Sequence, residues 1–163
     1  MILCIAEIRI RISTYPQQVV IMNSSSSEGL ATMTTRVLVA DDHSKLRKAL
    51  QSVITQKQDW QVCAEATSGE EAVEKFKTSH PDVVILDLVM GPMNGAEAAE
   101  EIMQESPDTI ILAISLYDAR PLMPRLQKIG VRGFIPKSRL SDDLIPAIEA
   151  VLRGKTWFQP SLV

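Results

Sequence analysis

Two patterns of apolar and polar residues alternate along the chain from residue 36 to about residue 153. One pattern is a short apolar run bounded by polar residues, which predicts a strand. These runs are 37–40, 62–66, 83–86, 110–114 and 133–136. Between the runs, apolar residues recur three and four positions apart, which predicts amphipathic helices. Five strands alternating with five helices predict a doubly wound α/β domain, with a five-stranded parallel sheet flanked by five helices.

Local signals place the ends of two of these helices. Ser68 and Glu71 fit a capping box, in which both side chains satisfy backbone N–H groups at the start of the second helix. We expect the fifth helix to be capped near Ser141 and to stop at Gly154.

The first 33 residues differ in character from the rest of the chain. Ile8–Ile12 alternates apolar and basic residues, and Ser24–Ser27 is a run of serine. Residues 1–33 are therefore assigned as an N-terminal extension, residues 34–153 as the folded domain and residues 154–163 as a C-terminal tail. The alternation is compatible with one edge strand. Two further alternatives are a disordered extension and a true start of translation at Met33.

Composition narrows the possible partners. The chain has 163 residues and a net charge of −3, without the basic field that duplex DNA usually requires. Cys4 and Cys63 lie far apart in the sequence, so neither a disulfide framework nor a zinc site is indicated. The longest apolar runs are far shorter than the roughly 18 residues of a membrane span. We expect a cytoplasmic protein that binds neither membrane nor DNA directly.

Polar and charged residues stand where the predicted strands end. Asp41 and Asp42 follow the first strand, and Asp87 ends the third. Ser115 ends the fourth strand, and Lys137 follows the fifth. Because ligands of doubly wound sheets bind at the carboxyl ends of the strands, we expect all five side chains at one edge.

Three carboxylates at one edge repel each other, by about 4 kcal/mol per pair at 4 Å near a protein surface. A divalent cation with oxygen ligands would offset this repulsion, and Mg2+ prefers one or two carboxylates with water and phosphate oxygens. A carboxylate can also accept a phosphoryl group, a reaction that depends on positioning and charge neutralisation. Lys137 supplies a further cation, and Ser115 supplies a hydroxyl donor.

Four segments together resemble the receiver domain of two-component response regulators. They are Val37–His43, Val84–Met90, Ile114–Ser115 and Phe134–Lys137. The resemblance covers about residues 34–153. It implies a flavodoxin-like, CheY-like sheet with strand order 2-1-3-4-5.

The resemblance also implies a role for each matching residue of the acidic group. Asp87 corresponds to the phosphoacceptor. Asp42 is expected to bind Mg2+ directly and Asp41 to support it, while the backbone carbonyl of Val89 is the other protein ligand.

Three further residues correspond to the family's switch. Lys137 is expected to pair with the phosphoryl group. Ser115 is expected to move toward that group on phosphorylation while the ring of Phe134 rotates inward.

Two features depart from the family pattern. The proline that usually follows the phosphoacceptor by four residues is replaced by Gly91, with Pro92 next to it, so we expect a looser loop. Pro121 and Pro124 fall in the segment of the fourth helix, which should therefore start late or be irregular. Pro146 raises the same question for the fifth helix.

Histidine and tryptophan residues indicate no additional site. A lone histidine at a helix start, such as His43, is more often a surface or packing residue than a metal ligand, and it is left unassigned. Trp60 and Trp157 are isolated in the sequence, so we expect them to pack in the core or tail.

The implied partners are a histidine kinase or phosphotransfer protein as donor, and a downstream protein or a second copy of the chain as output. The output face would be formed by the fourth helix, fifth strand and fifth helix. Val151–Phe158 resembles the end of NarL/FixJ-type receivers, which precede a helix-turn-helix domain. Both a single-domain regulator and a fragment of a transcription regulator therefore stay open.

Two enzyme or ligand-binding alternatives have weaker support. A phosphohydrolase with an aspartate nucleophile would need an acid at position 89, where the chain has valine. A nucleotide-binding module would need a glycine-rich loop after the first strand, where the chain has acidic residues. We therefore expect a phosphoacceptor signalling domain and not a turnover enzyme.

Overall fold

The computed structural model describes residues 11–12, 19–20 and 34–158. The chain divides into two units, Met1–Thr32 and Met33–Val163. In the first unit, β1 (Arg11–Ile12) pairs antiparallel with β2 (Val19–Val20). Residues 8–10 of the alternating segment lie outside the described residues.

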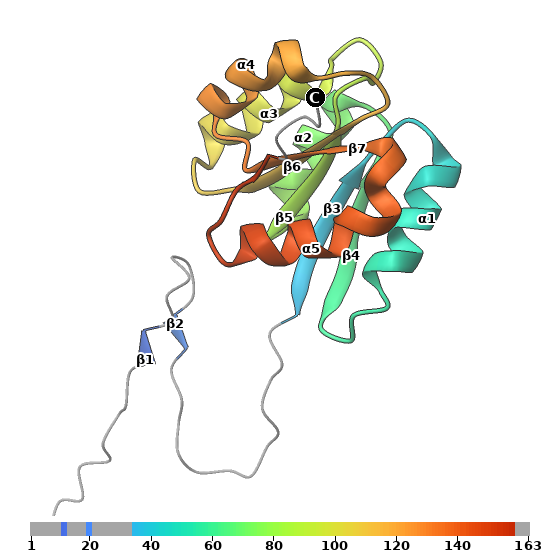
Figure 1. Cartoon of the computed structure of the whole chain (residues 1–163). Coiled ribbons are helices and arrows are strands. Elements are labelled where there is room, and N and C mark those ends of the chain that lie inside the picture. The colour runs from blue at the N-terminus through green and yellow to red at the C-terminus, as the bar shows by residue number, and fades with distance from the viewer. Residues whose placement is uncertain (1–10, 13–18, 21–33, 159–163) are drawn as a thin grey trace, which may run out of the picture. The chain divides into compact units, whose positions relative to one another are not determined.

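The second unit contains a parallel sheet with helices on both faces (Figure 1). Its strands are β3 (Thr35–Ala40), β4 (Trp60–Ala66), β5 (Val83–Asp87), β6 (Ile110–Ser115), β7 (Gly133–Pro136) and β8 (Trp157–Phe158). Its helices are α1 (Ser44–Ile54), α2 (Gly69–Ser79), α3 (Gly95–Glu105), α4 (Met123–Ile129) and α5 (Leu140–Leu152). The strand order is β4-β3-β5-β6-β7-β8. The doubly wound fold and the order of its first five strands are confirmed.

The expected number of five strands is wrong for residues 34–158, because β8 adds a sixth strand within the segment assigned as a tail. Gly154 has φ of +77°, which reverses the chain after α5. The backbone N–H of Trp157 then donates to the Arg132 carbonyl at 2.8 Å. Gly133 pairs with Trp157, and a Cβ on Gly133 would lie 2.8 Å from the Trp157 Cβ. A two-residue strand is too short to show a periodic pattern, so its pairing depends on this tertiary fit.

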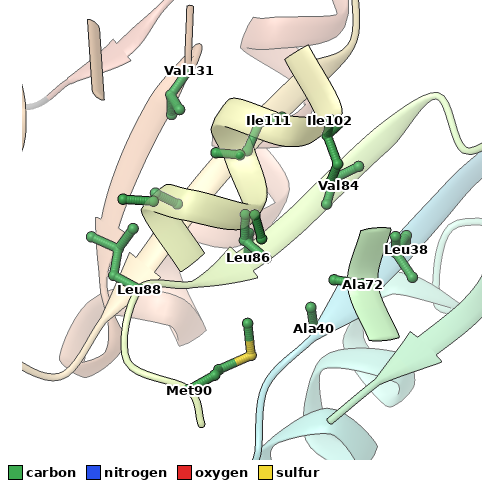
Figure 2. Close-up of a cluster of buried hydrophobic side chains, with 14 of the residues drawn as sticks. Leu38, Ala40, Ala72, Val84, Leu86, Leu88, Met90, Ile102, Ile111 and Val131 are labelled. Carbon is green, nitrogen blue, oxygen red and sulfur yellow. The ribbon is translucent and has the colours of Figure 1, made fainter. Parts of the chain in front are cut away.

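The core lies in two clusters, one on each face of the sheet. Helices α2, α3 and α4 cover one face, where Leu86 of β5 belongs to the same buried cluster as Ala72 and Ile102 (Figure 2). Helices α1 and α5 cover the other face, where Ile85 packs with Ile54 and Ile148. Neighbouring residues of β5 therefore face opposite clusters, and its five residues are all buried. This accounts for the apolar sequence of that strand.

The helix starts differ in part from the sequence prediction. The Ser68 hydroxyl accepts a hydrogen bond from the Glu71 N–H at 3.2 Å, but the Glu71 carboxylate accepts from the Thr67 N–H and not from Ser68. Helix α5 begins at Leu140 with no side-chain cap, so the expected cap near Ser141 is wrong. The 3-10 turn Lys137–Arg139 leads directly into α5 and places Ser141 inside its first turn.

The proline positions agree with a late and irregular fourth helix. A 3-10 turn, Arg120–Leu122, contains Pro121 and precedes the seven-residue α4. Pro124 lies in the first turn of α4, where a backbone N–H has no partner within the helix. Pro146 lies inside α5, which nevertheless runs from Leu140 to Leu152. Among the described helices, none is long and apolar enough to cross a membrane.

Candidate functional site

The predicted site residues lie at the carboxyl ends of neighbouring strands. Asp41 directly follows β3, while Asp87 and Ser115 end β5 and β6. The parallel register pairs Asp87 with Ile114 and Ser115 with Pro136, the residue before Lys137. The sheet therefore aligns these residues along one edge.

The Lys137 ammonium lies between two buried carboxylates. Its Nζ is 2.7 Å from Asp41 Oδ2 and 2.7 Å from Asp87 Oδ2. The side chains of Asp41 and Asp87 are 0% and 1% exposed, and that of Lys137 is 11% exposed. One cation therefore contacts two carboxylates directly, so Lys137, Asp41 and Asp87 together keep an excess of negative charge.

The other carboxylate oxygens are held by backbone donors. Asp41 Oδ1 accepts from the His43 N–H at 2.8 Å, and Asp87 Oδ1 accepts from the Val89 N–H at 3.2 Å. Asp41 Oδ2 meets the ammonium as an ion pair and makes no well-aligned hydrogen bond. This buried oxygen retains capacity to bind a cation.

Burial and charge move the pKa values of the central pair. Burial raises the pKa of Asp87, although the hydrogen bonds from Lys137 and Val89 act in the opposite direction. Burial lowers the pKa of Lys137, but the adjacent carboxylates of Asp41 and Asp87 outweigh it and raise the pKa above its ordinary value. Lys137 is therefore held in its charged form.

Asp42 lies at the exposed rim of the site and pairs with His43, to which the sequence assigned no role. Its Oδ1 is 2.6 Å from His43 Nδ1, and its side chain is 45% exposed. Ligand atoms of Asp41, Asp42 and His43 all lie within 4.8 Å of one another. Asp41 therefore belongs to both groups: its Oδ2 meets Lys137 together with Asp87, and its Oδ1 lies 3.4 Å from His43 Nδ1, beside Asp42.

The predicted switch residues are buried near this edge. Ser115 is 2% exposed, and its hydroxyl oxygen accepts from the Tyr117 N–H at 3.1 Å. Phe134 is 8% exposed and belongs to the cluster under α2, α3 and α4. The Phe134 ring is therefore already buried in the position from which it is expected to rotate.

The loop after Asp87 is held at several points, in contrast to the expected looser loop. Met90 is buried, and the Met93 N–H donates to Glu70 Oε1 at 3.2 Å. Asn94 and Glu97 form a reciprocal capping box at the start of α3. Gly95 follows, and a Cβ there would overlap the Asp87 carbonyl oxygen. Helix α3 thus packs directly against the backbone of Asp87.

Arg47 and Glu65 adjoin the acidic loop and were not singled out from sequence. Arg47 lies in the first turn of α1, next to the core-facing Leu46. A charged residue beside the apolar positions of a helix is a weak signal, because such residues usually reach solvent.

These residues place buried carboxylates and a paired ammonium together at the carboxyl ends of the strands. Residues 37–149 match the family described as the response regulator receiver domain. The chain belongs to this family. Receiver domains of this kind typically accept a phosphoryl group and bind Mg2+ at an acidic pocket.

Named relatives support the same assignment of the receiver domain. This chain is 33% identical over 128 residues to the oxygen regulatory protein NreC of Staphylococcus carnosus (strain TM300). The match covers 78% of this chain and 59% of the relative. A LuxR-family response regulator from Aurantimonas sp. SI85-9A1 superposes with a TM-score of 0.75 at 29% identity, covering 79% of this chain and 92% of the other.

The signal receiver domain of the putative response regulator NarL from Mycobacterium tuberculosis gives a TM-score of 0.70 at 29% identity, with 75% and 98% of the two chains covered. The chain spans 54% to 63% of the length of the curated relatives DegU, NreC and VraR. These relatives therefore support the receiver domain and not a particular output.

Proposed function

We propose that this receiver domain accepts a phosphoryl group on Asp87 from a histidine kinase or a phosphotransfer protein. The observation that carries the proposal is the position of Lys137 Nζ, 2.7 Å from Asp87 Oδ2 at the carboxyl ends of the strands. A carboxylate paired with an ammonium at a strand end provides both the nucleophile and a counter-charge for the arriving phosphoryl oxygens.

In the proposed transfer, a carboxylate oxygen of Asp87 forms a bond to phosphorus as the bond to the donor breaks. The donor nitrogen of phosphohistidine, or the oxygen of acetyl phosphate, leaves with its electron pair. The product is an acyl phosphate carrying a charge near −2. Lys137 contacts both Asp41 and Asp87 before the reaction, so it can exchange a carboxylate contact for one to the new phosphoryl oxygens.

The acidic group fits a magnesium ion. Asp41 Oδ2 is buried without a well-aligned hydrogen bond, and oxygen atoms are the ligands that Mg2+ prefers. Asp41, Asp42, Asp87 and the backbone carbonyl of Val89 would hold the ion. Bound there, Mg2+ would reduce carboxylate repulsion and neutralise charge on the transferred group.

Phosphorylation would be transmitted through Ser115 and Phe134 to the face formed by α4, β7 and α5. Phe134 and Lys137 are only three residues apart, so β7 connects the switch ring to the reacting edge. Phe158 of β8 pairs with Phe134 and packs against the same cluster. We therefore include β8 in this output face, which would bind a downstream protein or a second copy of the chain.

The proposed activity is stoichiometric signalling, with only self-phosphorylation and slow loss of the phosphoryl group. No duplex DNA binding is expected from residues 34–158, because the whole chain has a net charge of −3. The transcription-regulator alternative applies to a longer protein that contains this domain.

Mass spectrometry after incubation with acetyl phosphate and Mg2+ tests the proposal. We expect one added phosphoryl group that hydroxylamine removes and that Asp87→Ala abolishes. Asp108→Ala is the matched control, because Asp108 is exposed outside the site. Unchanged labelling of Asp87→Ala would exclude Asp87 as the acceptor. Labelling undiminished by a chelator would remove Mg2+ from the mechanism.

A further inference from the structure

Arg47 carries a charge close to the site but takes no part in the transfer described above. Its side chain is only 13% exposed, although arginine usually keeps its guanidinium in water. Nη1 donates to the backbone carbonyl oxygen of Asp41 at 2.7 Å. Nε donates to Glu65 Oε2 on β4 at 3.1 Å. The guanidinium therefore joins the acidic loop to the neighbouring strand.

The strand register explains why Glu65 can hold Arg47 at this point. Glu65 pairs with Val39, and Ala66 pairs with Ala40, so the end of β4 runs beside the end of β3. The Asp41 N–H donates to the Ala66 carbonyl at 3.1 Å. Glu65 therefore places the second anchor of Arg47 beside the start of the acidic loop.

The contact between Arg47 and Asp41 fixes a peptide group that matters for the site. The Asp41 carbonyl belongs to the planar peptide that leads to Asp42. The carboxylate of Asp41 is held separately, by His43 and Lys137. Holding the carbonyl as well restricts rotation of the peptide and so sets the direction in which Asp42 leaves the strand.

We propose that Arg47 and Glu65 are positioning residues that hold Asp41 and Asp42 in the geometry needed to bind a divalent cation. This inference rests on the proposed magnesium site. Replacing the hydrogen-bonded neighbours of metal ligands typically lowers metal affinity by about 10-fold to 100-fold. Arginine suits this role because its planar fork presents two donors in fixed directions, whereas lysine is a point charge.

Arg47→Lys separates positioning from simple charge, because it keeps the positive charge and loses the fork. We expect the full chain carrying Arg47→Lys to bind Mg2+ about tenfold more weakly than wild type in isothermal titration calorimetry. Glu65→Ala should weaken binding in the same direction by releasing the other end of the guanidinium. Melting curves without metal would show whether each variant is folded.

Arg125→Lys is the matched control, since Arg125 pairs with Glu100 in an exposed ion pair between α4 and α3. Its Mg2+ affinity should equal that of wild type. Folded Arg47→Lys with wild-type affinity would overturn the positioning role of Arg47. If Arg47→Lys does not fold, an unchanged Mg2+ affinity of Glu65→Ala would overturn the proposed positioning role of Arg47 and Glu65. Absence of Mg2+ binding by wild type would instead contradict the proposed metal site.

Discussion

Replacing Lys137 with methionine would test the charge balance at the sheet edge. In the wild type, one ammonium lies 2.7 Å from each of two carboxylates that are at most 1% exposed. Methionine has a similar length and no charge, so Asp41 and Asp87 would face each other without a cation. Removing one partner of a buried ion pair costs about 3–5 kcal/mol. We expect a loss of this size at pH 8, where both carboxyl groups of the variant would have to be charged.

The loss should shrink toward pH 5 because Asp87 can take up a proton. Burial already raises the pKa of Asp87, and removal of Lys137 would raise it further. A carboxyl group with a raised folded pKa contributes stability at low pH that is lost as the pH rises through that pKa. The penalty of Lys137→Met should therefore be larger at pH 8 than at pH 5.

Urea unfolding followed by circular dichroism measures this difference. With a slope of about 2 kcal/mol per molar urea, the midpoint at pH 8 should fall by about 2 M. Lys128→Met, on the exposed side of α4, should leave the midpoint nearly unchanged. A wild-type midpoint for Lys137→Met at pH 8, or an equal loss at both pH values, would refute the charge argument.

Magnesium provides a second readout from the same variant. Lys137 and a divalent cation would compete for the same carboxylates, so its removal should tighten Mg2+ binding. Saturation at 100 times the dissociation constant stabilises a protein by about 2.7 kcal/mol. Mg2+ at a fixed concentration should therefore raise the midpoint of Lys137→Met more than that of wild type. An equal or smaller rise would argue against shared ligands.

The other predictions concern the acceptor, the extension and β8. Without metal, wild type should lose stability relative to Asp87→Asn as the pH rises through the raised pKa of Asp87, and urea midpoints that differ by a constant amount would contradict this. Deleting residues 1–32 should leave melting temperature and phosphorylation nearly unchanged, because we propose that residues 34–153 form the receiver domain; a large loss of either would contradict that boundary. In a Trp60→Phe variant, Trp157 is the remaining tryptophan of the chain. Its fluorescence emission should change on phosphorylation because β8 pairs with β7. Constant emission from the fully phosphorylated protein would show that β8 takes no part in the switch.

The apolar pattern was sufficient to predict the parallel sheet and its layers. Val83–Leu86 is apolar at every position because β5 is buried on both faces. The same pattern placed Asp87, Ser115 and Lys137 at strand ends, since the ends of parallel strands follow directly from where the apolar runs stop. The sequence pattern did not predict β8 at Trp157, because a two-residue strand is too short to show a period. It also placed a helix cap near Ser141, where the structure has a 3-10 turn that leads into α5 without a side-chain cap.

The tertiary structure alone decided how the charges pair. The sequence placed three carboxylates at one edge, but the structure puts Lys137 between Asp41 and Asp87 and leaves Asp42 beside His43. Such pairings depend on strand register and rotamers, which a one-dimensional pattern does not contain. The contacts of Arg47 with β4 and with the Asp41 carbonyl arise in the same way. Sequence determines where strands end, whereas packing determines which charged atoms lie within 3 Å of each other.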